Sequence, residues 1–163
     1  MTTTVEDQRD DGRDESPNQR LDRNWIEILQ ELRVTQTGTQ ILTGFLLSIA
    51  FQPRFAALAA YQQRIYVALV VVAVLTTALG LAPVSLHRSL FRRRAKSLVV
   101  ATGHLVLRLV LLGVGLVLTG TTLLVVDVVL GLRAGLVVGA ATALLLTAIA
   151  VAPLVLWRGT AGG

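Results

Sequence analysis

The stretch that decides the fold runs from Trp25 to Phe51 and reads WIEILQELRVTQTGTQILTGFLLSIAF. Up to Arg33 it alternates charged and bulky residues, as helices at membrane surfaces do. From Ile41 onward it is apolar enough for the hydrocarbon of a bilayer. The pattern predicts one continuous helix that begins in water, with Asn24 as its N-cap. We expect a membrane span over residues 35–51, preceded by an interfacial helical extension.

The composition of the whole chain also indicates a membrane protein. The 163 residues are 53% hydrophobic and their mean hydropathy is +0.67, which is too apolar for a soluble domain of this length. The absence of cysteine from the sequence excludes disulfides and thiolate metal sites. The net charge of +5 gathers at the edges of apolar runs, so we expect no nucleic acid as a partner.

Three further apolar runs predict three further spans, over residues 65–86, 109–130 and 134–157. Each is long enough to cross the hydrocarbon at about 1.5 Å per residue. The expected fold class is therefore all-α, a polytopic membrane protein with four transmembrane helices in an antiparallel bundle. In the last span, Gly135 and Gly139 form a pair of small residues that suits close helix packing.

The remaining segments are polar. Residues 1–22 cannot bury enough apolar surface to fold, so we expect a disordered cytoplasmic tail. The transmembrane domain then covers residues 23–158, and residues 159–163 form a frayed end. The basic loop at residues 87–97 predicts cytoplasmic termini in a bacterial plasma membrane, by the positive-inside rule. The bilayer is thus a partner, and its anionic headgroups are expected to bind Arg88, Arg92, Arg93, Arg94 and Lys96.

Polar side chains follow one side of the first span. Arg33, Gln36, Gln40 and Thr43 share an arc of about 80° at about 100° per residue. Such a stripe should face protein rather than lipid. Either its side chains form hydrogen bonds between helices that fix the packing, or they line a polar path.

A second polar group is expected at the inner mouth of the bundle. Glu31 should pair there with Arg88 or Arg108, and His104 lies on the same helical face as Arg108. Arg108 and His104 are interpreted as an interfacial cation beside a hydrogen-bonded histidine, with a proton site as the alternative.

Asp127 is the one acidic residue inside the hydrophobic part of the chain. Gly113, Leu116 and Gly120 fall on nearly the same helical face, so a neighbouring helix can come close. Because a membrane carboxylate is costly, it pairs with a cation or takes part in ion or proton handling. The expected ion-pair partners are Arg54, Arg64 and Arg133. The candidate polar or ion path comprises Glu31, Arg33, Gln36, Gln40, Thr43, His104, Arg108 and Asp127.

No catalytic constellation, cofactor motif or metal-ligand spacing is found in the sequence, so we expect neither an enzyme nor a cofactor. The segment ELRVTQTGTQIL at residues 31–42 carries a resemblance, together with Ala82-Pro83, His87-Arg88 and Asp127. Over residues 24–157 the chain resembles a family of uncharacterised small membrane proteins from actinobacteria and related bacteria. Some members carry the automatic label sodium:proton antiporter. The resemblance implies no established substrate or catalytic residue.

Two classes of function remain. The label and the polar stripe favour a small cation or proton transport protein or transport subunit, which we expect to form a homo-oligomer. The alternative is a non-catalytic membrane interaction or scaffold protein. That alternative is favoured because the sequence has no pair of ionisable residues at mid-membrane.

Overall fold

The structure, a computed structural model, describes residues 16–83 and 96–160. Apart from short connections this part of the chain is helical, which confirms the all-α class. The helices are α1 (Pro17–Ile49), the short 3-10 helix η1 (Pro53–Ala57), α2 (Ala60–Gly80), α4 (Lys96–Leu130) and α5 (Leu132–Thr160).

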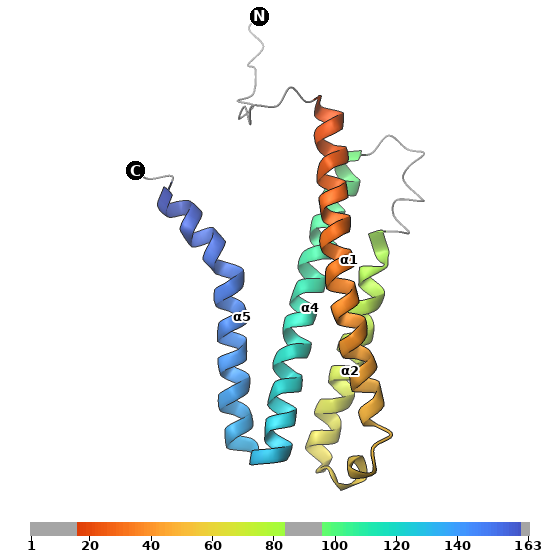
Figure 1. The fold of residues 1–163 in the computed structure, drawn as a ribbon, viewed down its shortest axis with the longest axis vertical. Helices are drawn as coiled ribbons and strands as arrows, with labels where there is room; N and C mark the ends of the chain where they lie inside the picture. The colour runs from red at the N-terminus through yellow and green to blue at the C-terminus, as the bar shows by residue number, and fades with distance from the viewer. Residues whose placement is uncertain (1–15, 84–95, 161–163) are drawn as a thin grey trace, which may run out of the picture.

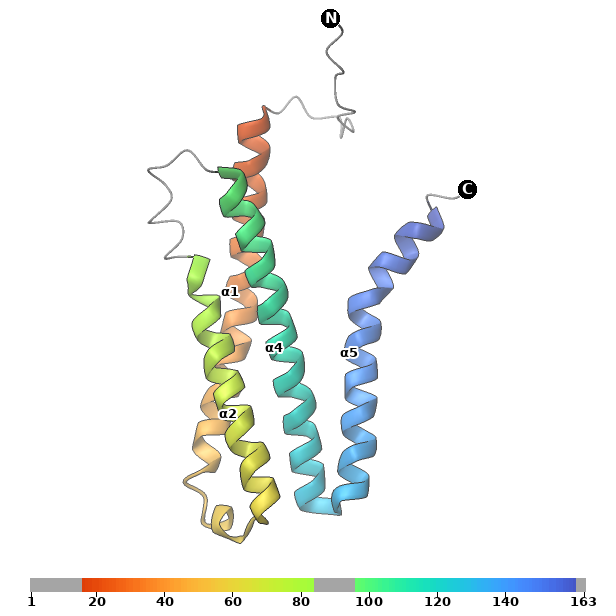
Figure 2. The same ribbon diagram turned by 180° about the vertical axis from the view of Figure 1, so that it is seen from behind.

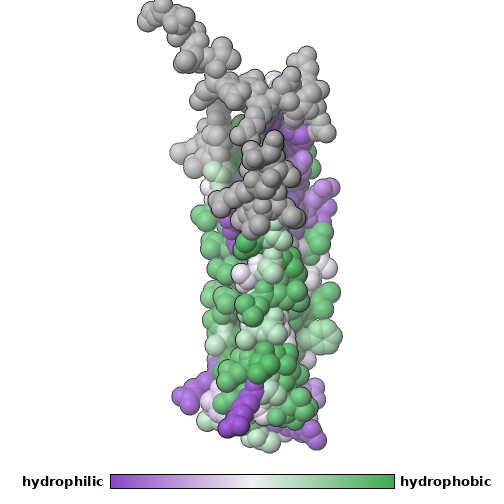
Figure 3. All heavy atoms as spheres, turned by 90° about the vertical axis from the view of Figure 1, so that its left-hand side faces the viewer, coloured by the Kyte–Doolittle hydropathy of each residue, from purple (hydrophilic) through white to green (hydrophobic). Residues whose placement is uncertain are grey.

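Three of these helices are long and apolar enough to cross a membrane: α2, α4 from Val100 onward, and α5 as far as Pro153. The predicted first span lies in α1, which is not among the helices apolar enough to cross a membrane. Figure 3 shows the face that α5 presents, where an apolar band has hydrophilic side chains at its lower end and toward its upper end. The distribution is that of a membrane protein.

Helix α1 begins earlier than the sequence predicted. Ser16, rather than Asn24, is its N-cap, and Pro17 occupies the first turn. The backbone N–H of Gln19 donates to the Ser16 hydroxyl at 3.3 Å, and the Ser16 N–H donates to Gln19 Oε1 at 2.8 Å. This reciprocal capping box explains why residues 17–22, predicted as part of a disordered tail, are helical. Residues 1–15 of that tail lie outside the described residues.

The core lies among α1, α2 and α4, which pack on one another (Figures 1 and 2). Toward the chain's N-terminal end, α1 and α4 enclose a cluster centred on Trp25, Ile28 and Val110. Toward η1, all three helices enclose a second cluster that includes Leu46, Tyr66 and Val117. The Tyr66 hydroxyl donates to the Leu46 carbonyl at 2.6 Å, and the Tyr66 ring meets Phe55 edge-on at a centroid distance of 4.9 Å. These contacts fix the lower end of α1 against α2.

Glycines allow α4 to approach α2 closely. A Cβ on Gly113 would collide with Thr76, and one on Gly120 would collide with Leu69. Leu69 and Thr76 are separated by the same seven positions as Gly113 and Gly120, so the two helices repeat the same close contact along their length. The predicted glycine face is thus present. Leu116, placed on it by the sequence, is instead 55% exposed, and Val117 is buried.

Helix α5 contacts mainly α4. The connection between them is Gly131 alone, whose φ of 92° is a left-handed conformation that glycine adopts without strain. Its N–H donates to the Asp127 carbonyl at 2.9 Å and ends α4. The predicted pair Gly135 and Gly139 is buried against α4, whereas the C-terminal part of α5 leads away from it (Figures 1 and 2). Pro153 lies within α5 and removes one helical hydrogen bond.

The predicted span limits differ from the helix ends. Helix α2 starts at Ala60 and the predicted span at residue 65, because residues 60–64 continue the helix at its polar end. Helix α4 begins at Lys96, so the predicted third span, residues 109–130, is the C-terminal part of a longer helix. Helix α5 continues to Thr160, two residues into the segment predicted to fray. Residues 84–95, which include most of the basic loop, and residues 161–163 lie outside the described part.

Candidate functional site

Asp127 lies where the ends of α2, α4 and α5 meet, and its side chain is 3% exposed. The Tyr61 hydroxyl donates to both carboxylate oxygens, at 3.1 Å to Oδ1 and 2.9 Å to Oδ2. Gln62 Nε2 donates to Oδ2 at 3.1 Å. In the described part of the chain Asp127 forms no ion pair. The prediction of an ion pair with Arg54, Arg64 or Arg133 is therefore wrong, and two neutral donors take the place of the cation.

The local structure explains why these donors are available. Tyr61 and Gln62 lie in the first turn of α2, and Gln62 Oε1 accepts from the Ala59 N–H at 2.9 Å. One amide group thus caps α2 and also binds Asp127. The N-terminus of a helix carries partial positive charge, so the carboxylate is stabilised without a cation. A glutamine three residues after the start of a helix is a signal that sequence reasoning could have used.

Helix α5 closes this corner. A Cβ on Gly135 would lie 2.8 Å from the Leu123 carbonyl oxygen, 2.9 Å from Asp127 Cβ and 3.0 Å from Asp127 N. The first turn of α5 therefore rests directly on the backbone of α4 beside the carboxylate. Asp127, in α4, is therefore hydrogen-bonded to α2 and packed against α5, so a shift of either helix would alter its surroundings.

Threonine side chains occupy the interface between α1 and α2. Thr39 and Thr43 of α1 are buried, as is Thr76 of α2, which lies against Gly113 of α4. Thr43 donates to the Thr39 carbonyl at 2.7 Å and lies 3.3 Å from the hydroxyl of Thr77. Thr76 and Thr77 each bond to the carbonyl four residues earlier, at 2.7 and 2.9 Å. These bonds satisfy the hydroxyl donors within their own helices, as in packed membrane interfaces.

The predicted polar stripe is divided by the fold. Thr43 is buried, and Gln36 is half-buried with its side chain 3.9 Å from the position of a Cβ on Gly80. Arg33 and Gln40 are exposed. The arc of these four residues straddles the edge of the buried face, whose centre is set by Ile28, Leu32, Thr39 and Leu46.

A second line of small and polar residues, which shares Arg33 and Gln40 with the predicted stripe, lies on the side of α1 away from its buried face. At about 100° per residue its members share an arc of about 80°, and all are exposed. Thr37 and Ser48 bond to carbonyls of their own helix, at 3.0 and 2.7 Å. We call this line the α1 outer stripe: Gln30, Arg33, Thr37, Gln40, Gly44 and Ser48.

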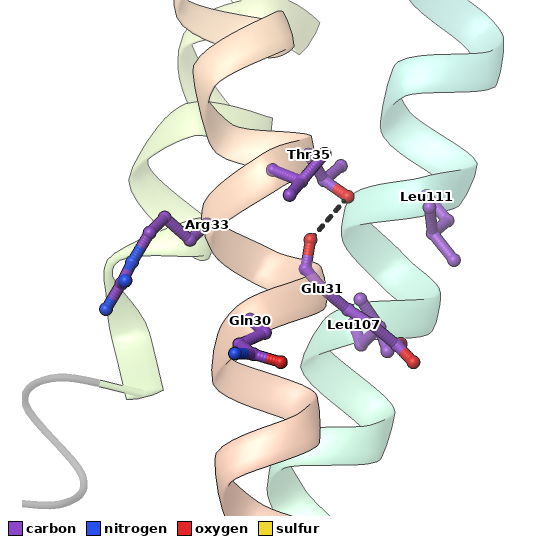
Figure 4. A pocket seen from close by; sticks show the side chains of 7 residues that line it. Gln30, Glu31, Arg33, Thr35, Leu107 and Leu111 are labelled. Carbon is purple, nitrogen blue, oxygen red and sulfur yellow. Dashed lines mark hydrogen bonds between the residues drawn. The ribbon is translucent and has the colours of Figure 1, made fainter.

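The predicted inner mouth is an open groove of about 630 Å³ between α1 and α4 (Figure 4). Leu107 and Leu111 form its α4 side, and Glu31 extends beside Leu107. The Thr35 hydroxyl donates to the Glu31 carbonyl at 2.8 Å, so it satisfies the backbone and not the carboxylate. Arg33 points away from Leu111 (Figure 4).

The charged cluster expected at this mouth does not form among the described residues. Glu31, His104 and Arg108 are exposed, and Glu31 and Arg108 are not paired. The other expected partner, Arg88, lies outside the described residues, as do the predicted headgroup ligands Arg92, Arg93 and Arg94. Lys96 is the first residue of α4. In the part of the chain that the structure describes, no group of acidic and histidine side chains could hold a metal ion.

The sequence matches one family model over residues 14–153, described as a family of unknown function, DUF6328. The match extends from the start of α1 to Pro153 in α5 and thus includes the whole packed structure. It gives no organism and no activity. No curated protein and no solved structure matches the chain. The chain therefore belongs to the DUF6328 family, which confirms the expected membership of an uncharacterised family.

Proposed function

We propose that the chain is a membrane protein with a non-catalytic interaction role and four spans. Helix α1 is a span in addition to α2, α4 and α5. Helix α1 is joined to α2 by the hydrogen bond from Tyr66 to Leu46 and by the contact of Thr43 with Thr77. Leu46 and Thr43 are thus at the depth of the α2 span, Ala60–Gly80. Since α2 and α4 cross the hydrocarbon, the C-terminal half of α1 crosses it beside them, and the helices form an antiparallel bundle.

The interaction role rests on one observation, the α1 outer stripe. Gln40 is one turn from Thr43, at a depth where α2 is apolar, and the residue is exposed. An amide in hydrocarbon that lacks a hydrogen-bond partner costs several kcal/mol, at about 4–8 for transfer to an apolar solvent. Polar residues at this depth face protein or a wet cavity. A protein surface that covers the stripe removes this cost.

The basic residues at 87–97 support a cytoplasmic loop that contacts anionic headgroups, with both termini cytoplasmic in a bacterial plasma membrane. In this arrangement η1 and Gly131 are on the outer side of the membrane.

Spin labelling tests the interaction role. The chain contains no cysteine, so Gln40→Cys and Leu75→Cys each accept a single nitroxide. Leu75 is 62% exposed and lies next to Thr76 on α2, at nearly the depth of Gln40, which makes it the matched control. In native membranes we expect oxygen to reach the label at position 75 and to be largely excluded from position 40. Equal oxygen accessibility at both positions would refute the proposal.

A cation or proton transport protein is the second candidate, favoured by the buried Asp127 carboxylate that has no cation beside it. Buried membrane carboxylates are often proton carriers. The test is Asp127→Asn, measured for melting in detergent and for proton flux in liposomes. Loss of pH-driven flux with unchanged melting supports transport. If the wild-type chain shows no flux and Asp127→Asn lowers the melting temperature, Asp127 stabilises the contact of α2, α4 and α5 and does not carry protons.

A further inference from the structure

We propose that the groove between α1 and α4 binds a phospholipid whose headgroup carries a primary amine. The open groove has a volume of about 630 Å³. Leu107 and Leu111 give it an apolar side, and Glu31 extends beside Leu107 (Figure 4). An apolar surface with a few polar groups binds an amphipathic ligand in one orientation. The site depends on the membrane depth that the proposed function gives α1, and it does not depend on Gln40.

The groove lies where the hydrocarbon meets the headgroups. The side chain of Gln36 lies 3.9 Å from the position of a Cβ on Gly80, the last residue of the α2 span. Glu31 precedes Gln36 by five residues, or about 7.5 Å along the helix. The headgroup layer is about 5–8 Å thick on each side of a bilayer, so Glu31 is at headgroup depth. Leu111 is one turn deeper than Leu107, at the depth where the acyl chains begin.

Glu31 is the reason for expecting an amine. Its exposed carboxylate forms no ion pair or hydrogen bond with the residues that the structure describes. The Thr35 hydroxyl, which also lines the groove, donates to the Glu31 carbonyl instead. A primary ammonium offers three donors, and hydrogen bonds between charged groups are about twice as strong as neutral ones. A choline headgroup has no donor, and a headgroup with net negative charge is repelled by the carboxylate.

Helix α4 supplies the cation for the lipid phosphate. Gly103 faces α1, and at about 100° per residue Leu107 follows at about 40° around the helix and Arg108 at about 140°. Arg108 is exposed and therefore lies beyond the leucines, on the side of the groove away from Glu31. His104, also exposed, lies between Leu107 and Arg108. Arginine binds phosphate oxygens with two parallel donors, so the acid and the base together are complementary to a zwitterionic headgroup.

Lipid binding followed by native mass spectrometry tests the proposal. The purified chain is stripped of lipid in detergent and titrated with phosphatidylethanolamine, phosphatidylcholine or phosphatidylglycerol of the same acyl chains. We expect phosphatidylethanolamine to bind about tenfold more tightly than the other two, because one hydrogen bond between charged groups is worth at least that factor. Glycerophosphoethanolamine has the headgroup without chains and should not compete, because it cannot use Leu107 and Leu111. Equal affinity for the three lipids, or competition by the chainless headgroup, would overturn the lipid site.

Variants of single charges assign the roles within the groove. Glu31→Gln should abolish the preference for phosphatidylethanolamine, whereas Glu31→Asp, which keeps the carboxylate, should retain it. The matched control is Glu27→Gln, since Glu27 is exposed, lies one turn earlier on α1 and does not line the groove. Arg108→Gln should weaken binding of all three lipids by similar factors. A Glu31→Gln chain that keeps the preference, or a Glu27→Gln chain that loses it equally, would contradict the proposal.

This experiment can fail separately from the spin-label test of the interaction role. Equal oxygen accessibility at positions 40 and 75 would leave the lipid preference unchanged, because the label at position 40 does not touch the groove. If no lipid shows a preference and Glu31→Gln lowers the melting temperature in lipid-free detergent, the carboxylate is paired within the chain. The lipid site is then wrong, while the interaction role still stands on its own measurement.

Discussion

Replacing Gly135 with alanine tests whether α5 rests on the backbone of α4. The added methyl would lie 2.8 Å from the Leu123 carbonyl oxygen and 3.0 Å from the Asp127 nitrogen. Both are backbone atoms of a packed helix, so no side-chain rotation can relieve the contact. Helix α5 must therefore move outward by a few tenths of an ångström, which loosens the corner that holds Asp127.

The magnitude follows from two opposing effects. Overpacking of this kind costs about 1–3 kcal/mol, and the better helix propensity of alanine returns up to about 1 kcal/mol. We expect Gly135→Ala to lower the free energy of unfolding by about 1–2 kcal/mol. The matched control is Gly38→Ala in α1, where the methyl meets nothing within 4 Å and where the propensity effect alone should stabilise by up to about 1 kcal/mol.

The assay is reversible unfolding in mixed detergent micelles with increasing dodecyl sulfate, followed by circular dichroism. The expected difference between the two variants is about 2–3 kcal/mol, the sum of their opposite effects. A Gly135→Ala protein as stable as Gly38→Ala would refute the close contact of α5 with α4.

Three more predictions use the same preparation or intact cells. Tyr61→Phe removes a donor to the Asp127 carboxylate and should destabilise the chain in the same assay, whereas in an Asp127→Ala background it should have almost no further effect; additive losses would contradict the shared bond. Thr43→Val and Thr77→Val should show a coupling of about 0.6 kcal/mol in a double-mutant cycle, the average for side-chain hydrogen bonds between membrane helices; zero coupling would mean that the 3.3 Å contact contributes nothing. In intact cells an impermeant maleimide should label Gln52→Cys but not Gln19→Cys, and the reverse pattern would invert the topology.

The sequence was sufficient for the elements whose signals are local and strong. The helical class and the pair Gly135 and Gly139 follow from apolar length and from the spacing of small residues. The predicted start of α1 at Asn24 is wrong, because Ser16 and Gln19, which have the spacing of a capping box, begin the helix within the polar segment. Two capping signals in one polar segment can be ranked only if the length of the helix is known.

The hydrogen-bond partners of Asp127 could not be predicted from the sequence. Pairing rules for charges select cations, and Arg54, Arg64 and Arg133 were at the right depth. The fold instead turns the first residues of α2 toward the carboxylate, so that Tyr61 and Gln62 bind it. The burial of the predicted polar stripe, Arg33, Gln36, Gln40 and Thr43, was only partly predicted for a related reason. An arc of about 80° fixes which residues are neighbours, but which edge of the arc is buried depends on where α2 and α4 pack.

The one-residue connection at Gly131 bears on how the chain enters a membrane during synthesis. Two consecutive Cα–Cα steps span at most about 7 Å, so the end of α4 and the start of α5 cannot separate. In the proposed topology this short connection favours entry of α4 and α5 as one hairpin. Asp127 and Arg133 would then pass through the hydrocarbon together at its tip. An inserted flexible linker at Gly131 would convert this single insertion event into two.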